Sequence, residues 1–264
     1  MKQTRLLWTP VSAFWWRDVI RFLRQRNRII GALATPLVFW LLVGSGFGPS
    51  FHNPSAASEG STYLAYFFPG TIVLIMLFTA IFSTISVIED RREGFLQGAL
   101  VAPLSPAAIP LGKFLGGTTL AVLQAMLFCV LAPFAGIPIG GMQALLLLPA
   151  FILVGFCMTG LGFLVAWPMD STQGFHAIMN IFLMPLWMMS GALFPMPAGS
   201  GWLYWVGLLN PVSYSVSVIR DAFMISSTNG VLADYTLSLI VTLLFGAVTF
   251  GVSVYLVGNP RKKR

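Results

Sequence analysis

The sequence predicts an all-α membrane protein. Only 9% of its 264 residues are charged, whereas 57% are hydrophobic, and the mean hydropathy is +0.84. A soluble domain carries about 25% charged residues, so water cannot be the main solvent for this surface. Helices are expected because lipid offers no hydrogen-bond partner to open backbone groups, and the alternating pattern of a membrane β-barrel is missing from the sequence.

Six apolar runs are each long enough to cross a bilayer, which takes about 20 residues. They lie at 29–49, 63–87, 107–133, 143–167, 175–194 and 235–257. We therefore expect one transmembrane domain over residues 1–264. It would consist of a cytoplasmic amphipathic helix at 1–28, a six-helix bundle at 29–257 and a basic cytoplasmic tail at 258–264.

The positions of Lys and Arg predict the orientation. Seven of these residues precede the first apolar run, three belong to the loop after the second, four close the chain, and the segments on the other side hold only Arg220. By the positive-inside rule, both termini and the charged loop are cytoplasmic, as in a multi-pass protein of the plasma (bacterial inner) membrane. The net charge of +7 mainly reflects this topology and favours anionic lipids, with little reason to expect nucleic acid.

The segment before the first apolar run predicts a helix with two faces. Its arginines recur at helical spacing, at Arg17, Arg21, Arg24 and Arg28. Apolar residues gather on the opposite side, at Val11, Trp15, Val19 and Phe22. Such a helix is expected to lie in the membrane interface, with Trp15 in the acyl boundary and the arginines toward phosphates. The same helix could also contact a cytoplasmic partner.

The stretch from Phe194 to Asp234 is too apolar for an exposed outer loop. Prolines and glycines interrupt it at Pro195, Pro197, Gly199 and Gly201. Asn210-Pro211 is a typical helix start, with Asn as the cap and Pro at the first helical position. We expect a re-entrant pair of short outer helices between the fifth and sixth spans.

No motif in the sequence supplies energy or catalysis. Ion-coupled carriers need titratable groups inside the bilayer, and the predicted spans place none near mid-membrane. A phosphate-binding loop is not formed, because Gly112-Lys113 has Ala107 where the first glycine is required and Phe114 where Ser or Thr is required. We therefore predict a chain that is not an enzyme and carries no metal or cofactor, which either conducts passively or takes energy from a partner.

The densest charge cluster runs from Glu89 to Leu96, between two apolar runs, and is soon followed by Pro103. A charged start and an apolar continuation favour a short cytoplasmic helix over 89–103 that meets a soluble partner. The alternative is a solvated loop that merely obeys the positive-inside rule.

These residues resemble a known family. Glu89-x-x-x-Glu93-Gly94-x-Leu96, followed by Pro103-Leu104-Ser105 and Leu111-Gly112-Lys113, resembles the first cytoplasmic loop of the ABC type-2 exporter permeases. Ser190-Gly191-Ala192-Leu193-Phe194-Pro195 and Leu209-Asn210-Pro211-Val212-Ser213-Tyr214, with Arg220, resemble that family's fifth span and outer re-entrant segment. The likeness covers nearly the whole chain.

The resemblance implies a permease subunit of a homodimer or heterodimer, driven by a separate ABC ATPase subunit that binds ATP with Mg²⁺. The residues of its coupling helix would be Glu89, Arg92, Glu93, Gly94, Phe95 and Leu96. The N-terminal helix would be the connecting helix that flanks the ATPase. One difference is Gln97, which stands where many relatives have Glu, so charge pairing with the ATPase would be weaker there.

The cargo is less well indicated. Aromatic and methionine side chains with few polar groups suit a drug-like, lipid-like or lipid-linked glycan molecule. Candidate residues of a translocation path are Gln124, Asn180, Trp187 and Met188. Aromatic and methionine side chains at helical spacing, however, more often form the core of a helix bundle than a translocation path. A different class of protein, a non-transporting membrane scaffold or passive channel that recruits a cytoplasmic partner, is the alternative.

Overall fold

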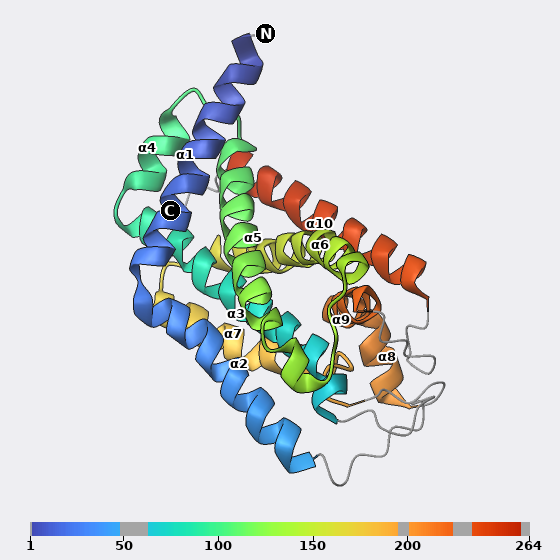
Figure 1. Ribbon diagram of the computed structural model, residues 1–264. Helices are drawn as coiled ribbons and strands as arrows, with labels where there is room; N and C mark the ends of the chain where they lie inside the picture. The colour runs from blue at the N-terminus through green and yellow to red at the C-terminus, as the bar shows by residue number, and fades with distance from the viewer. Residues whose placement is uncertain (1, 48–62, 195–200, 224–233, 260–264) are drawn as a thin grey trace.

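The computed structural model describes residues 2–47, 63–194, 201–223 and 234–259, and within these ranges the chain is helical without strands. The helices are α1 (Lys2–Arg24), α2 (Arg26–Phe47), α3 (Tyr63–Arg92), α4 (Phe95–Val101), α5 (Ala108–Cys129), the 3-10 helix η2 (Ala132–Ala135), α6 (Gly141–Ala166), α7 (Thr172–Met188), α8 (Trp202–Leu209), α9 (Pro211–Ala222) and α10 (Tyr235–Gly258). Figure 1 shows their arrangement. The predicted all-α fold is confirmed for this part of the chain.

Five of these helices are long and apolar enough to cross a membrane: α2, α3, α5, α6 and α10. Each coincides with one of the six predicted runs. The remaining run, at 175–194, coincides with α7, which has only 17 residues. Length and composition therefore support five spans among the described residues.

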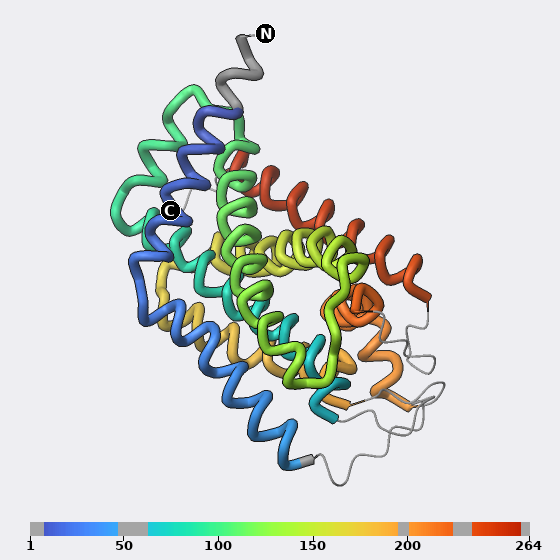
Figure 2. The backbone as a smooth tube through the Cα atoms, viewed as in Figure 1, coloured from blue at the N-terminus to red at the C-terminus, as the bar shows by residue number. Residues whose placement is uncertain are grey.

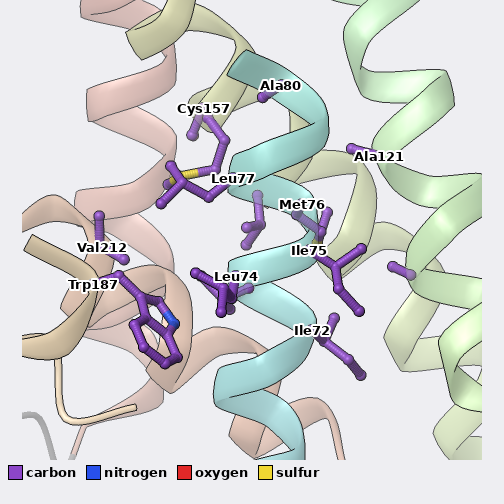
Figure 3. Packing of buried hydrophobic residues seen from close by; sticks show 14 of the residues in the cluster. Ile72, Leu74, Ile75, Met76, Leu77, Ala80, Ala121, Cys157, Trp187 and Val212 are labelled. Carbon is purple, nitrogen blue, oxygen red and sulfur yellow. The ribbon is translucent and has the colours of Figure 1, made fainter. Parts of the chain in front are cut away.

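Helix α3 is the centre of the bundle. It packs against α2, α5, α6 and α9, and Figure 2 shows it running diagonally between α2 on one side and α10 on the other. Because lipid gives no hydrophobic drive for helix association, this burial reflects close packing. Figure 3 shows side chains of α3, from Ile72 to Ala80, meeting Ala121 of α5, Cys157 of α6, Trp187 of α7 and Val212 of α9.

The outer faces of the bundle carry exposed apolar side chains. On α10 they include Leu237, Ile240, Leu243, Leu244, Val248 and Val252. Helix α10 is a candidate span, and only 28% of its apolar window is buried inside the protein. An unbroken apolar face on a helix of this length is suited to contact with acyl chains.

Helix α1 packs along α5, as Figure 1 shows, and differs from the prediction in two ways. It ends at Arg24, so Arg28 belongs to α2 and not to the same helix. Its apolar face, which includes Val11, Val19 and Phe22, is buried. Trp15 Nε1 donates a hydrogen bond of 3.0 Å to Thr119 Oγ1 of α5. Helix α5 thus covers part of Trp15, which is half-buried, and its place in the acyl boundary stays a prediction.

Close contact between α1 and α5 depends on Gly112. A Cβ at this position would lie 2.5 Å from Phe14 Cβ and 3.0 Å from the Val11 carbonyl oxygen, both of which are held by the backbone of α1. A glycine therefore lets the two helices approach in a way that any side chain would prevent.

The Gly112→Ala variant is expected to displace α1 from α5 and to lower the free energy of unfolding by about 1–3 kcal/mol, as overpacking does. Trypsin should then cleave faster at the arginines of α1, which a time course followed by mass spectrometry will measure. Gly98→Ala is the matched control, because a Cβ there meets nothing within 4 Å. Equal protease resistance of both variants would contradict the contact.

Two short helices, α8 and α9, lie in the segment where a helix pair was predicted. The predicted start of α9 is confirmed, since Asn210 Oδ1 accepts a hydrogen bond of 3.0 Å from the Val212 amide and Pro211 is the first helical residue. Asn210 Nδ2 also donates to the Leu186 carbonyl oxygen at 2.5 Å, which joins the cap to α7. Helix α9 is almost entirely buried among α3, α6 and α10. The prolines at 195 and 197 lie outside the described residues.

Candidate functional site

The candidate site is the corner between α3 and α4. Helix α3 ends at Arg92, and the Glu93 amide still donates to the Glu89 carbonyl oxygen at 2.9 Å. Gly94 then adopts a φ of +78°, in the left-handed region that costs other residues about 1–2 kcal/mol. This glycine turns the chain into α4, which covers only Phe95–Val101. The short helix predicted over 89–103 is corrected here, because the residues up to Arg92 continue α3.

Carboxylates at the end of α3 are paired with arginines of the N-terminal helices. Asp90 Oδ1 accepts from Arg17 Nη2 at 2.7 Å and from Arg21 Nη1 at 2.8 Å. Arg21 Nη2 also donates to Glu93 Oε1 at 2.7 Å, and Arg28 pairs with Glu89. These contacts tie α1 and the start of α2 to the α3–α4 corner.

A lysine completes this network beneath the corner. Lys113 of α5 is 2% exposed, and its Nζ donates to Asp18 Oδ1 at 2.8 Å, Ser86 Oγ at 2.9 Å and Asp90 Oδ2 at 2.6 Å. Three acceptors match the three donors of the ammonium group. The lysine therefore joins α1, α3 and α5 through one side chain.

The complete set is electrically balanced. Four cations, at Arg17, Arg21, Arg28 and Lys113, face four carboxylates, at Asp18, Glu89, Asp90 and Glu93. Ion pairs withdrawn from water need such compensation, because an unpaired buried charge costs several kcal/mol. We call these eight residues the charge clasp.

The two clasp residues Asp18 and Arg21, both on α1, have displaced pKa values. Burial raises the pKa of Asp18, and the neighbouring Lys113 offsets this only in part. Burial acts to lower the pKa of Arg21, but the charges of Glu89, Asp90 and Glu93 outweigh it and raise the value. Asp18 therefore takes up a proton more readily than an ordinary aspartate does.

The residues predicted to couple with an ATPase are divided between this clasp and the surface. Glu89 and Glu93 are engaged by the chain's own arginines. Leu96 is 1% exposed, so it packs inside this chain. Phe95 lies against Phe14 and under Arg17, whose Cζ is 3.8 Å from the ring centroid.

Other residues of the corner face outward. They include Arg92, Gln97, Gly98 and Val101, and Glu93, Gly94 and Phe95 are exposed as well. Val101 is 87% exposed. A second protein can therefore touch the outer face of α4 and the exposed parts of Glu93, Gly94 and Phe95, whereas Glu89 and Leu96 contribute little.

Sequence reasoning missed Asp18 and Lys113 as members of this site. The available signals were weak: Asp18 is the one acidic residue among the first 28, and Lys113 is the one charge within an apolar run. The two side chains are 95 positions apart, so spacing along the chain does not pair them.

The predicted path residues fall into two groups. Gln124 and Trp187 are buried: Gln124 Oε1 accepts from Thr79 Oγ1 at 2.6 Å, and Trp187 Nε1 donates to the Gly70 carbonyl oxygen at 2.8 Å. Asn180 and Met188 are exposed on α7. Within the described ranges, no three His, Cys, Asp or Glu side chains group as a metal site requires.

Comparison with known protein families identifies the class of this helical membrane protein. Residues 9–224 match the family model described as ABC-2 type transporter, and the chain is a member of that family. It is therefore a membrane permease of an ABC transporter, a transmembrane and not a catalytic subunit. Membership implies, in general, an ATPase partner and a dimeric arrangement of permeases.

Individual relatives agree with this class. The chain is similar to ycf38 of Cyanophora paradoxa, named a transport permease, with 26% identity over 245 residues that cover 89% of this chain and 84% of the relative. It is similar to Nodulation protein J of Sinorhizobium fredii (strain NBRC 101917 / NGR234), with 26% identity over a region that covers 86% of this chain and 84% of the relative. It also matches YbhR of Escherichia coli (strain K12), which is named a multidrug ABC transporter permease. The identity is 24% over a region that covers 66% of this chain and 46% of the relative.

Proposed function

We propose that this permease forms the translocation path of an ATP-driven exporter and receives force from a separate ATPase subunit at residues 89–103. The observation that carries the proposal is the outer face of α4, where Val101 is exposed beside charged and polar residues. An apolar side chain held out by a short rigid helix suits the groove of a second protein. ATP with Mg²⁺ would bind to that partner.

The charge clasp gives the force a route into the bundle. A displacement of α4 moves Phe95 and Glu93, which contact Arg17 and Arg21 of α1. It also moves the end of α3, which Lys113 holds to α5. The Lys113–Asp90 pair is buried and the contacts to Arg17 and Arg21 are close, so in this proposal α1, α3 and α5 move together as one unit.

The proposed topology has six spans, with α7 as the fifth and the α8–α9 pair re-entering from the outer side. Both termini are cytoplasmic, in the plasma (bacterial inner) membrane. The uneven distribution of Lys and Arg supports this orientation. The burial of α9 supports a segment packed against protein at membrane depth, where broken helices are tolerated.

The proposed cargo is an amphipathic molecule, either drug-like, lipid-like or a lipid-linked glycan. The exposed face of α7 combines Asn180 with apolar side chains such as Phe182 and Met188. Apolar walls can hold a ring or acyl group while a few dipoles orient it. The multidrug name of the YbhR relative is compatible with this chemistry.

The test is a single change on the outer face of α4. The tagged chain is purified from its own host's membranes, and the co-purifying ATPase is measured by photolabelling with azido-ATP. Val101→Asp is expected to reduce the captured ATPase at least tenfold, because it places a charge in an apolar contact. The chain itself should still insert.

Val130→Asp is the matched control, since this valine is also exposed but lies at the other end of α5. It should retain the ATPase. Full capture by Val101→Asp would overturn the assignment of α4. A wild-type chain that purifies without any nucleotide-binding subunit would instead favour a scaffold or passive channel.

A further inference from the structure

The junction between α1 and α2 carries two arginines that the charge clasp does not use. Helix α1 ends at Arg24 and α2 begins at Arg26, with Gln25 between them. Arg24 and Arg26 are exposed. In the described part of the chain, neither has a carboxylate within ion-pair distance, whereas Arg28 is paired with Glu89. The positive charge of this junction is thus concentrated on two side chains.

Two open cavities lie at this junction. One, of about 460 Å³, is lined by residues 24–28, and the other, of about 330 Å³, is lined by Arg17, Ile20, Arg21, Arg24 and Gln25. Arg24 borders both. These volumes are in the range of small-ligand sites and exceed what one inorganic ion would fill.

Apolar side chains flank the two free arginines. Leu23 is 51% exposed and Ile30 is 60% exposed, and the apolar part of α2 begins directly after the junction. Exposed apolar groups next to exposed arginines are typical of the boundary between acyl chains and headgroups. An acidic protein surface would account for the arginines but would leave Leu23 and Ile30 uncovered.

We propose that the α1–α2 junction binds an anionic phospholipid, such as phosphatidylglycerol. Arg24 and Arg26 hold its phosphate. The acyl chains cover Leu23 and Ile30. The inference rests on the membrane embedding of the chain and not on the proposed coupling to an ATPase.

The test is native mass spectrometry of the full-length protein in detergent, titrated with phosphatidylglycerol or with phosphatidylcholine. The wild-type chain is expected to bind phosphatidylglycerol preferentially. The double variant Arg24→Gln, Arg26→Gln should bind it about 30-fold more weakly, since each basic side chain near an anionic surface contributes about fivefold. Binding of phosphatidylcholine should not change.

Two controls keep the result specific. Arg92→Gln removes an exposed arginine elsewhere and should leave lipid binding within twofold of the wild type. Arg24→Lys, Arg26→Lys keeps the charge and should retain most of the binding, which separates loss of the site from loss of the fold.

Three outcomes would overturn the proposal. The Gln double variant could bind phosphatidylglycerol as the wild type does. Millimolar inorganic phosphate could displace the lipid completely, which would indicate a site for a free anion. The Gln double variant could lose the co-purifying ATPase while keeping the lipid, which would assign the junction to an acidic protein surface.

Discussion

The Lys113→Met variant will lose about 3–5 kcal/mol of folding free energy, because breaking a buried ion pair leaves uncompensated charge. Methionine fills a similar volume but offers no donor to Asp18, Ser86 or Asp90. Asp18 then keeps a contact of 3.5 Å to Ser86 Oγ, while its strongest cationic partner is lost. Unfolding in mixed micelles at increasing fractions of sodium dodecyl sulfate, followed by tryptophan fluorescence, will measure the change.

The pH dependence of this variant provides a second readout. Burial raises the pKa of Asp18, so the folded state takes up a proton at this carboxyl more readily than the unfolded state does. Stability gained in this way rises as pH falls through the folded-state pKa. Without Lys113 the effect is larger, and the loss in Lys113→Met should shrink from neutral toward acidic pH.

Replacing each of the two aspartates by asparagine tests whether the ion pairs of the charge clasp, and not a general sensitivity of this region to mutation, cause the loss of stability. Asp90 is contacted by Lys113, Arg17 and Arg21, whereas Asp18 shares only Lys113 at close range. Asp90→Asn should therefore cost clearly more than Asp18→Asn. Equal losses in both variants, or a Lys113→Met loss below 1 kcal/mol, would show that the clasp contributes little.

The helices could be predicted because their signals are local. A run of apolar residues marks a span, and Asn210-Pro211 marks a helix start, whatever the rest of the chain does. The face of α1 could be predicted for the same reason. Its partner could not, because an amphipathic pattern shows that a face is apolar without showing whether lipid or protein covers it.

The candidate site depended on contacts that are distant in sequence. Glu89 and Glu93 were recognised as a cluster, but the arginines that neutralise them lie 61 to 72 positions earlier. Once those pairs form, the free surface of the corner moves from Glu89 to the outer face of α4. The charge cluster in the sequence lies at the corner between α3 and α4, but only the packing of α1 distinguishes the inner residues of this corner from its exposed ones.

The Trp187→Ala variant is expected to lose about 3–5 kcal/mol of folding free energy, as large-to-small changes in a packed core do. Trp187 is completely buried, its Nε1 donates to the Gly70 carbonyl oxygen at 2.8 Å, and its ring lies beside Phe39 and Phe67. Figure 3 shows the indole pointing toward α3 near Leu74. The measurement is the same detergent titration, read through the remaining tryptophans.

The neighbouring residue Met188 allows an effect on transport to be distinguished from an effect on packing. Met188 is 47% exposed, so Met188→Ala should change stability by no more than about 0.5 kcal/mol. If α7 borders the translocation path, Met188→Ala alters ATP-dependent uptake of a fluorescent amphipathic dye into inverted vesicles while its unfolding curve stays unchanged. A stable Trp187→Ala variant with altered dye uptake would reverse the two roles and return Trp187 to the path.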